Sequence, residues 1–75
     1  MADKLLDARR LACPLPILKT IKAMKDVPIG GTLEILATDP QSVADLVAFA
    51  TKGRHEMVER SHTDGIYRFV IRRGN

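Results

Sequence analysis

Residues 32–40 read TLEILATDP and join the clearest strand of the chain to the start of a helix. Apolar residues alternate on one face of this strand, namely Leu33, Ile35 and Ala37. Asp39 suits the N-cap of the helix that follows, and Pro40 suits its first helical position. We therefore expect a strand over 32–38 and a helix that ends at Gly53. Asp39 is interpreted as a cap rather than as a catalytic carboxylate.

Upstream of this stretch, residues 13–16 read CPLP and contain Cys13, the one cysteine of the sequence. A proline deep inside a helix costs about 3 kcal/mol, whereas a proline in the first turn removes only donors that lack an intrahelical acceptor. Pro14 and Pro16 therefore predict a helix start with Cys13 as its N-cap. The apolar face predicted for this helix consists of Pro14, Ile17, Leu18, Ile21 and Met24 or Lys25.

A thiol at a helix start is favoured as a thiolate, because unpaired backbone N–H groups and the helix dipole stabilise negative charge. Arg9 and Arg10 add positive charge close by, and the N–H of Leu15 is the nearest donor for the sulfur. These features predict a pKa for Cys13 below the ordinary value of about 8.5. The alternative is a small buried apolar cysteine. With no second cysteine to form a disulfide, any group bound to Cys13 must pass to another molecule.

The C-terminal part of the chain predicts a β-hairpin. Two strand-like runs between Glu56 and Arg73 are joined at residues 63–65, and the Asp-Gly pair there is a strong hairpin signal. The second run is the most β-prone segment, so we expect it inside the sheet. With a short strand at residues 4–7, the order is βαβαββ. This order predicts an α/β two-layer sandwich, with two helices on one face of a four-stranded mixed sheet.

Composition and charge limit the class of protein. Residues 1–75 suffice for one domain, and a charged fraction of 28% is ordinary for a soluble globular chain. Neither a membrane-spanning run nor a secretory signal is present, and an unpaired thiol suits a reducing compartment, so we expect a cytoplasmic protein. The net charge of +3 is spread along the chain and favours acidic partners.

Short motifs follow one another in a fixed order along the chain. They are Leu6-Asp7, Leu11-Ala12-Cys13-Pro14-Leu15-Pro16, Ala37-Thr38-Asp39-Pro40 with Asp45, His55-Glu56, and Asp64-Gly65 followed by Tyr67-Arg68-Phe69 and Ile71-Arg72. This pattern resembles the TusA/SirA family of small sulfur carrier proteins over nearly the whole chain. That family commonly has glycine three residues before the cysteine, where this chain has Arg10. Because arginine does not adopt a positive φ cheaply, either the loop takes another path or glycine is not required.

The resemblance implies that residues 1–75 form a single sulfur-carrier domain, in which Cys13 is the persulfide carrier and Pro14 and Pro16 form the helix start. A cysteine desulfurase or rhodanese-type donor would load Cys13, and an acceptor protein would receive the sulfur. The relay would serve tRNA thiolation, molybdenum cofactor assembly or sulfur oxidation. The protein would act as a persulfide sulfurtransferase that carries sulfur, as a monomer without a cofactor or metal.

We expect partner proteins to dock around Cys13 on a positive rim of Arg9, Arg10, Lys19 and Lys22. Two other functions stay open. A small basic module could contact RNA phosphates through Lys19, Lys22, Lys25, Arg68, Arg72 and Arg73. A redox-regulatory protein would instead form mixed disulfides at Cys13. Direct binding to nucleic acid or a membrane is not the favoured interpretation, and His55 and His62 are expected at the surface rather than in catalysis.

Overall fold

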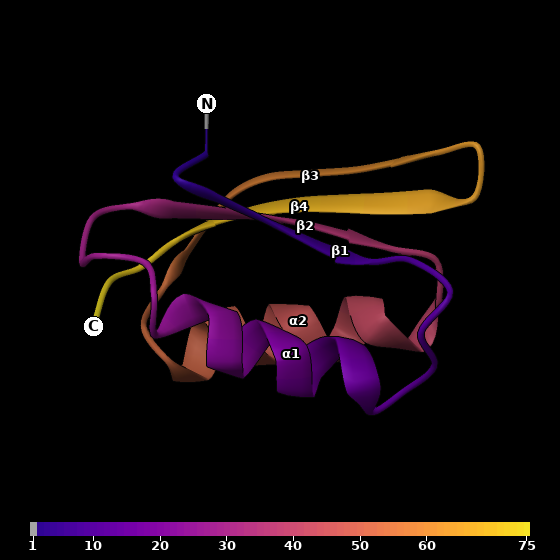
Figure 1. The fold of residues 1–75 in the computed structure, drawn as a ribbon, viewed down its shortest axis with the longest axis horizontal. Helices are drawn as coiled ribbons and strands as arrows, with labels where there is room; N and C mark the ends of the chain where they lie inside the picture. The colour runs from indigo at the N-terminus through magenta and orange to yellow at the C-terminus, as the bar shows by residue number, and fades with distance from the viewer. Residues whose placement is uncertain (1) are drawn as a thin grey trace.

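Two helices lie side by side under one face of a four-stranded sheet in the computed structural model, which describes residues 2–75 (Figure 1). The elements are β1 (Lys4–Ala8), α1 (Leu15–Met24), β2 (Thr32–Ala37), α2 (Gln41–Lys52), β3 (Glu56–Thr63) and β4 (Ile66–Arg72). The predicted α/β two-layer sandwich and its βαβαββ order are confirmed.

The strands are arranged in the order β1-β2-β4-β3, so β4 lies inside the sheet as its apolar composition predicted. β1 and β2 are parallel, and the other two pairs are antiparallel. Because β1 and β2 are parallel, their C-terminal ends meet at the same edge of the sheet. The loops that lead into α1 and α2 therefore start next to each other, and this places the candidate site.

The hairpin between β3 and β4 forms at the predicted residues. Asp64 and Gly65 have φ values of 53° and 77°, and Thr63 pairs with Ile66 across the turn. Two consecutive residues with positive φ form the two-residue turn that matches the twist of antiparallel strands. The Asp-Gly signal is thereby confirmed.

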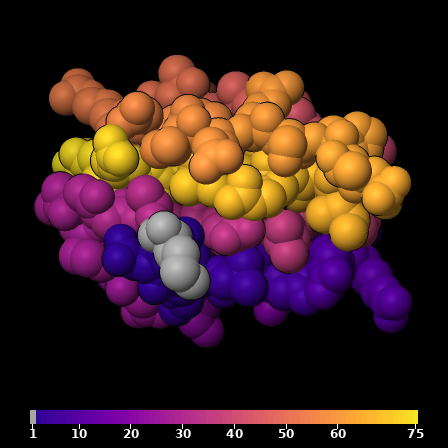
Figure 2. Space-filling model, turned by 90° about the horizontal axis from the view of Figure 1, so that it is seen from above, coloured from indigo at the N-terminus to yellow at the C-terminus, as the bar shows by residue number. Residues whose placement is uncertain are grey.

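The core fills the space between the helices and the sheet. Its fully buried side chains include Leu33 and Ile35 of β2, Phe69 and Ile71 of β4, and Leu46 of α2. The other face of the sheet has no helix over it (Figure 2). The carboxylates of Glu34 and Glu59 both pair with Arg68 of β4, at 2.7 and 3.3 Å, and link β2, β4 and β3.

The buried face of α1 agrees with the predicted one only in part, because Met24 is buried and Ile17 packs against the core as predicted. The side chains buried against the sheet are Pro16, Thr20, Ala23 and Met24. Leu18 and Ile21, which were predicted to face the core, are 54% and 40% exposed. Small side chains let the helix approach the sheet, and Thr20 tolerates burial because its hydroxyl donates to the carbonyl of Pro16 at 2.8 Å. In helix α2 the apolar residues Leu46 and Ala50, four positions apart, are buried on one face.

The loop between β1 and α1 keeps a left-handed residue at Arg10, whose φ is 69°. The N–H of Arg10 donates to Thr38 Oγ1 at 2.8 Å, which ties this loop to the end of β2. The loop therefore has the conformation that a glycine would adopt freely, and Arg10 adopts it at a steric cost.

Replacing Arg10 by glycine should stabilise the fold by about 1 kcal/mol. A left-handed residue with a Cβ costs roughly 1–2 kcal/mol, and the extra freedom of glycine in the unfolded chain offsets only part of that gain. In a domain of this size the melting temperature should rise by about 4–8 °C. Arg10→Ala is the matched control, because it removes the guanidinium and keeps the Cβ. An equal rise in both variants would assign the effect to the side chain instead of the backbone.

Candidate functional site

Cys13 lies in the loop between β1 and α1 with an exposed thiol. The Cys13–Pro14 peptide bond is cis, and Pro14 rather than Cys13 is the N-cap of α1. The N–H of Leu15 donates to the carbonyl of Ala12 at 2.9 Å. The backbone donor that was predicted to face the sulfur is therefore already used within the loop.

Asp39 holds this loop in place. Its Oδ2 accepts the N–H of Cys13 at 2.7 Å, and its Oδ1 accepts the N–H of Gln41 at 3.1 Å. Asp39 was predicted to be the N-cap of α2, but Pro40 is the N-cap and Asp39 precedes it. The carboxylate of Asp39 still accepts an N–H of the first turn. One carboxylate thus joins the start of α2 to the backbone of the cysteine, a second contact that the capping interpretation missed.

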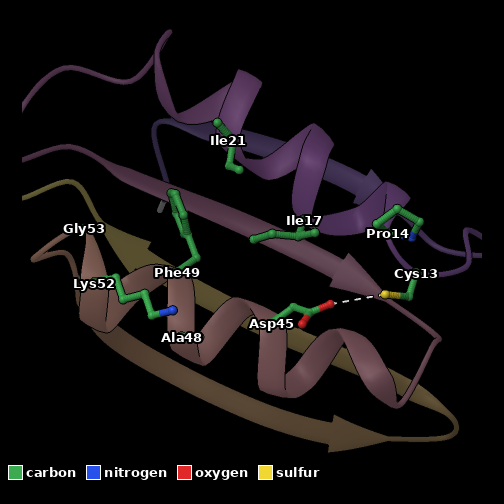
Figure 3. Close-up of a pocket in the computed structure, with 9 residues that line it drawn as sticks. All are labelled: Cys13, Pro14, Ile17, Ile21, Asp45, Ala48, Phe49, Lys52 and Gly53. Atoms are coloured by element: carbon green, nitrogen blue, oxygen red, sulfur yellow. Dashed lines mark hydrogen bonds between the residues drawn. The ribbon is translucent and has the colours of Figure 1, made fainter.

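The sulfur itself points at Asp45 of α2 (Figure 3). Cys13 Sγ donates to Asp45 Oδ2 at 3.3 Å. The hydrogen bond to Asp45 is the main cause that raises the pKa of Cys13 above its ordinary value, and partial desolvation and the negative charges of Asp45 and Asp39 add to it. The predicted lowering of this pKa is wrong, because carboxylates rather than free backbone donors face the thiol.

Cys13 and Asp45 lie at one end of an open hollow of about 670 Å³ between the two helices. Figure 3 shows Lys52 and Gly53 toward its other end, and Ile17 and Ile21 of α1 along one side. The residues that line the hollow are Cys13, Pro14, Ile17, Ile21, Asp45, Ala48, Phe49, Lys52 and Gly53. The site is therefore a mainly apolar hollow with a thiol and a carboxylate at one end. Lys52 is the one cationic residue among those that line it.

The four cations of the predicted positive rim fall into two groups elsewhere. Arg9 pairs with Asp7 at 2.8 Å, and this hydrogen-bonded pair lowers the pKa of Asp7 to about 2. Arg9 and Arg10 line a separate hollow of about 520 Å³. Lys19 and Lys22 line another, on the side of α1 that faces β1. None of the four lines the hollow that contains Cys13, and the cation that does, Lys52, was not predicted.

The two histidines lie away from the thiol. His55 stacks on Phe49, with ring centroids 5.0 Å apart, and its Nδ1 accepts the N–H of Gly74. His62 stacks on Tyr67 with centroids 4.0 Å apart. Neither histidine lines the hollow of Cys13. Within residues 2–75, no cluster of three metal-ligating side chains occurs, and none of the helices is long and apolar enough to cross a membrane.

The chain is similar to known proteins over nearly its whole length. The family described as sulfurtransferase TusA matches residues 4–73. A candidate sulfur carrier protein of Bacillus subtilis, YrkI, is 42% identical over 73 residues, which cover 97% of each chain. The sulfur carrier protein TusA of Allochromatium vinosum is 41% identical over 71 residues, which cover 95% of this chain and 93% of that protein. A longer candidate carrier of B. subtilis, YrkF, is 49% identical over 73 residues, and the match spans 40% of its length.

A solved structure shows the same fold. The SirA-like protein of Desulfitobacterium hafniense superposes with a TM-score of 0.84, covering 96% of this chain and 99% of that one at 24% identity. Membership of the family rests on two findings. The family model matches residues 4–73, and two relatives are more than 40% identical over nearly their full length. The chain belongs to the TusA sulfurtransferase family.

Proposed function

We propose that this protein is a sulfur carrier that accepts sulfane sulfur as a persulfide on Cys13 and passes it to an acceptor protein. The observation that carries the proposal is the exposed thiol of Cys13 at the end of the hollow, in a chain of the TusA family. An exposed sulfur on a loop can enter the active site of a larger partner without rearrangement of the fold. The relatives named as sulfur carriers support the same role.

Loading exchanges one sulfur–sulfur bond for another. The Cys13 thiolate attacks the terminal sulfur of a donor persulfide, R–S–SH, and the new S–S bond forms as the donor S–S bond breaks. The donor leaves as R–S⁻ and takes up the proton that Cys13 released. In the second transfer an acceptor thiolate attacks the terminal sulfur on Cys13, which leaves as a thiolate. Neither transfer needs an added oxidant or reductant.

The partners follow from this chemistry. The donor must present a persulfide, so we propose a cysteine desulfurase or a rhodanese-type protein, and the acceptor must present a thiol. We propose tRNA thiolation, molybdenum cofactor assembly or sulfur oxidation as the pathway that uses the sulfur. A reducing cytoplasm suits an exposed unpaired thiol such as Cys13.

We further propose that partners contact the apolar face of α1 beside the thiol. Its exposed side chains are Leu15, Leu18 and Ile21, at 45%, 54% and 40% exposure. Ile21 also lines the hollow of Cys13. The predicted cationic rim remains part of the proposal, with Arg9 and Arg10 on one side of the loop and Lys19 and Lys22 along α1. Charge at such a rim acts mainly on the rate of association.

The RNA-binding alternative has less support, because three of its six cations are engaged within the protein. Arg68 pairs with Glu34 and Glu59, and Arg72 pairs with Glu56 at 3.1 Å. The guanidinium of Arg73 donates to the carbonyl of Val27 at 2.6 Å. These guanidinium groups would have to give up internal partners to bind phosphates.

A redox-regulatory protein would form a mixed disulfide at Cys13, whereas a sulfur carrier forms a persulfide. The product on the thiol therefore distinguishes the two roles.

Incubation with a cysteine desulfurase and cysteine, or with a small persulfide, should add one sulfur atom to the protein. Intact mass spectrometry measures the addition, and a reductant should reverse it. Cys13→Ser is the matched control and should stay unmodified, because it removes the thiol and keeps the size of the side chain. The carrier role fails if the wild-type protein stays unmodified with several donors while its thiol still reacts with an alkylating agent.

Leu18→Glu should slow sulfur transfer from a cognate donor about tenfold or more, because it places a charge in the proposed contact face next to the helix start. The melting temperature should stay near that of the wild type, since Leu18 is 54% exposed. Ile29→Glu is the matched control, because Ile29 is 70% exposed and follows the opposite end of α1. Equal transfer rates in the two variants would show that partners do not use this face.

A further inference from the structure

The carboxylate of Asp45 is hydrogen-bonded to the reactive sulfur, and within residues 2–75 it forms no ion pair. Its Oδ2 accepts the thiol of Cys13 at 3.3 Å, and neither Asp45 nor Asp39 occurs among the salt bridges. Asp45 is half-buried on α2, so its orientation is fixed better than that of a fully exposed side chain. The charge of this carboxylate has no counterion at short range.

The charged groups around the thiol come from three segments. Asp45 and Lys52 belong to α2 and line the same hollow as Cys13, and Asp39 precedes α2 and binds the backbone of Cys13. Arg9 and Arg10 belong to the loop before Cys13, but Arg9 is paired with Asp7 and both line another hollow. The immediate surroundings of the sulfur are therefore acidic although the whole chain carries a net charge of +3.

This arrangement keeps the sulfur in its less reactive form while the protein is free. The attacking species in persulfide exchange is the thiolate, and a neighbouring carboxylate disfavours it. The raised pKa of Cys13 agrees in direction with this geometry. A positive group placed against Asp45 would offset its charge and release the thiol proton to solvent. A productive partner therefore has to supply a positive group that pairs with Asp45.

We propose that Asp45 is a positioning and selectivity residue of sulfur transfer, which holds Cys13 as a thiol in the free protein and pairs with a lysine or arginine side chain of the sulfur donor. This inference rests on the proposed sulfur carrier function. The apolar side chains of Ile17 and Phe49 line the hollow beyond Asp45 and would contact the aliphatic part of such a side chain. The transfer step keeps its balance, since Cys13 loses one proton and the departing donor thiolate gains one.

Charged thiol reagents test the local field without any partner protein. We expect the cationic trimethylammonioethyl methanethiosulfonate to modify Cys13 faster than the anionic sulfonatoethyl reagent, by on the order of tenfold at low salt. Asp45→Asn should bring the two rates close together. It should also lower the pH midpoint of the reaction with the neutral methyl reagent and raise its rate near pH 7, because the acceptor stays in place without its charge. Added salt should reduce the wild-type preference.

Two variants control for net charge and for structure. Glu56→Gln removes one negative charge at the start of β3, next to the C-terminal end of α2 and away from Cys13, and should keep the wild-type preference. Asp45→Glu keeps the negative charge and should retain at least part of the preference for the cationic reagent. Equal rates of the two charged reagents in the wild type, or the same cation preference in Asp45→Asn as in the wild type, would overturn the inference.

Sulfur loading itself gives the second readout. The persulfide of cysteamine, a cation, should load wild-type Cys13 faster than the persulfide of 3-mercaptopropionate, an anion, and Asp45→Asn should abolish this order. If both persulfides load Cys13 at equal rates in the wild type, the role of Asp45 in donor selection is wrong while the carrier function stands. If neither loads it although the charged reagents react in the expected order, the carrier function fails and Asp45 governs only the reactivity of the thiol.

Discussion

The hydrogen bond from the backbone N–H of Cys13 to Asp39, 2.7 Å long, connects the two halves of the site. It depends on the parallel pairing of β1 and β2, because only that pairing brings the loops after both strands to one edge of the sheet. The same carboxylate accepts the N–H of Gln41 at the start of α2. Once the loop of Cys13 is fixed to this end of α2, Asp45 lies one helical turn beyond Gln41 and meets the sulfur.

Two opposing effects act on the thiol, and the local one dominates. The dipole of α1 favours a thiolate, but at an exposed helix end it is screened by solvent, and the N–H of Leu15 is occupied by the carbonyl of Ala12. The carboxylate of Asp45 is in direct contact and favours the thiol. Direct hydrogen bonding to one protonation state outweighs a diffuse field from the backbone, and the pKa of Cys13 is raised accordingly.

The sequence allowed most of the fold to be predicted, because its strongest signals are local. The alternation of residues 32–37, the Asp-Gly turn and the apolar β4 each depend on a few neighbouring residues, and all three are confirmed. The buried face of α1 was predictable only in part, at Ile17 and Met24. Leu18 and Ile21 are as apolar as core residues, and periodicity does not distinguish a face that packs on a sheet from a face left open to solvent.

The candidate site was predictable in its nucleophile but not in its surroundings. Cys13 was predicted to be functional because the prolines that follow it indicate a helix start. The contact with Asp45 spans 32 positions of the chain and depends on how α2 lies beside α1, which no local signal describes. The sequence could have indicated Asp45 only through two facts taken together. These are the parallel pairing of β1 and β2, and the position of Asp45 one turn into α2.

A raised pKa of the carrier sulfur affects both directions of transfer. During loading, each unit of increase lowers the thiolate fraction tenfold, and the greater nucleophilicity of the thiolate restores only part of it, so attack slows by about three- to fourfold. During unloading, Cys13 is the leaving group, and a thiol of higher pKa leaves more slowly. The contact with Asp45 therefore slows uncontrolled exchange whether the sulfur is loaded or empty. On our proposal for Asp45, a partner that neutralises this carboxylate accelerates both steps at the moment of docking, which suits a carrier that must keep its sulfur between two partners.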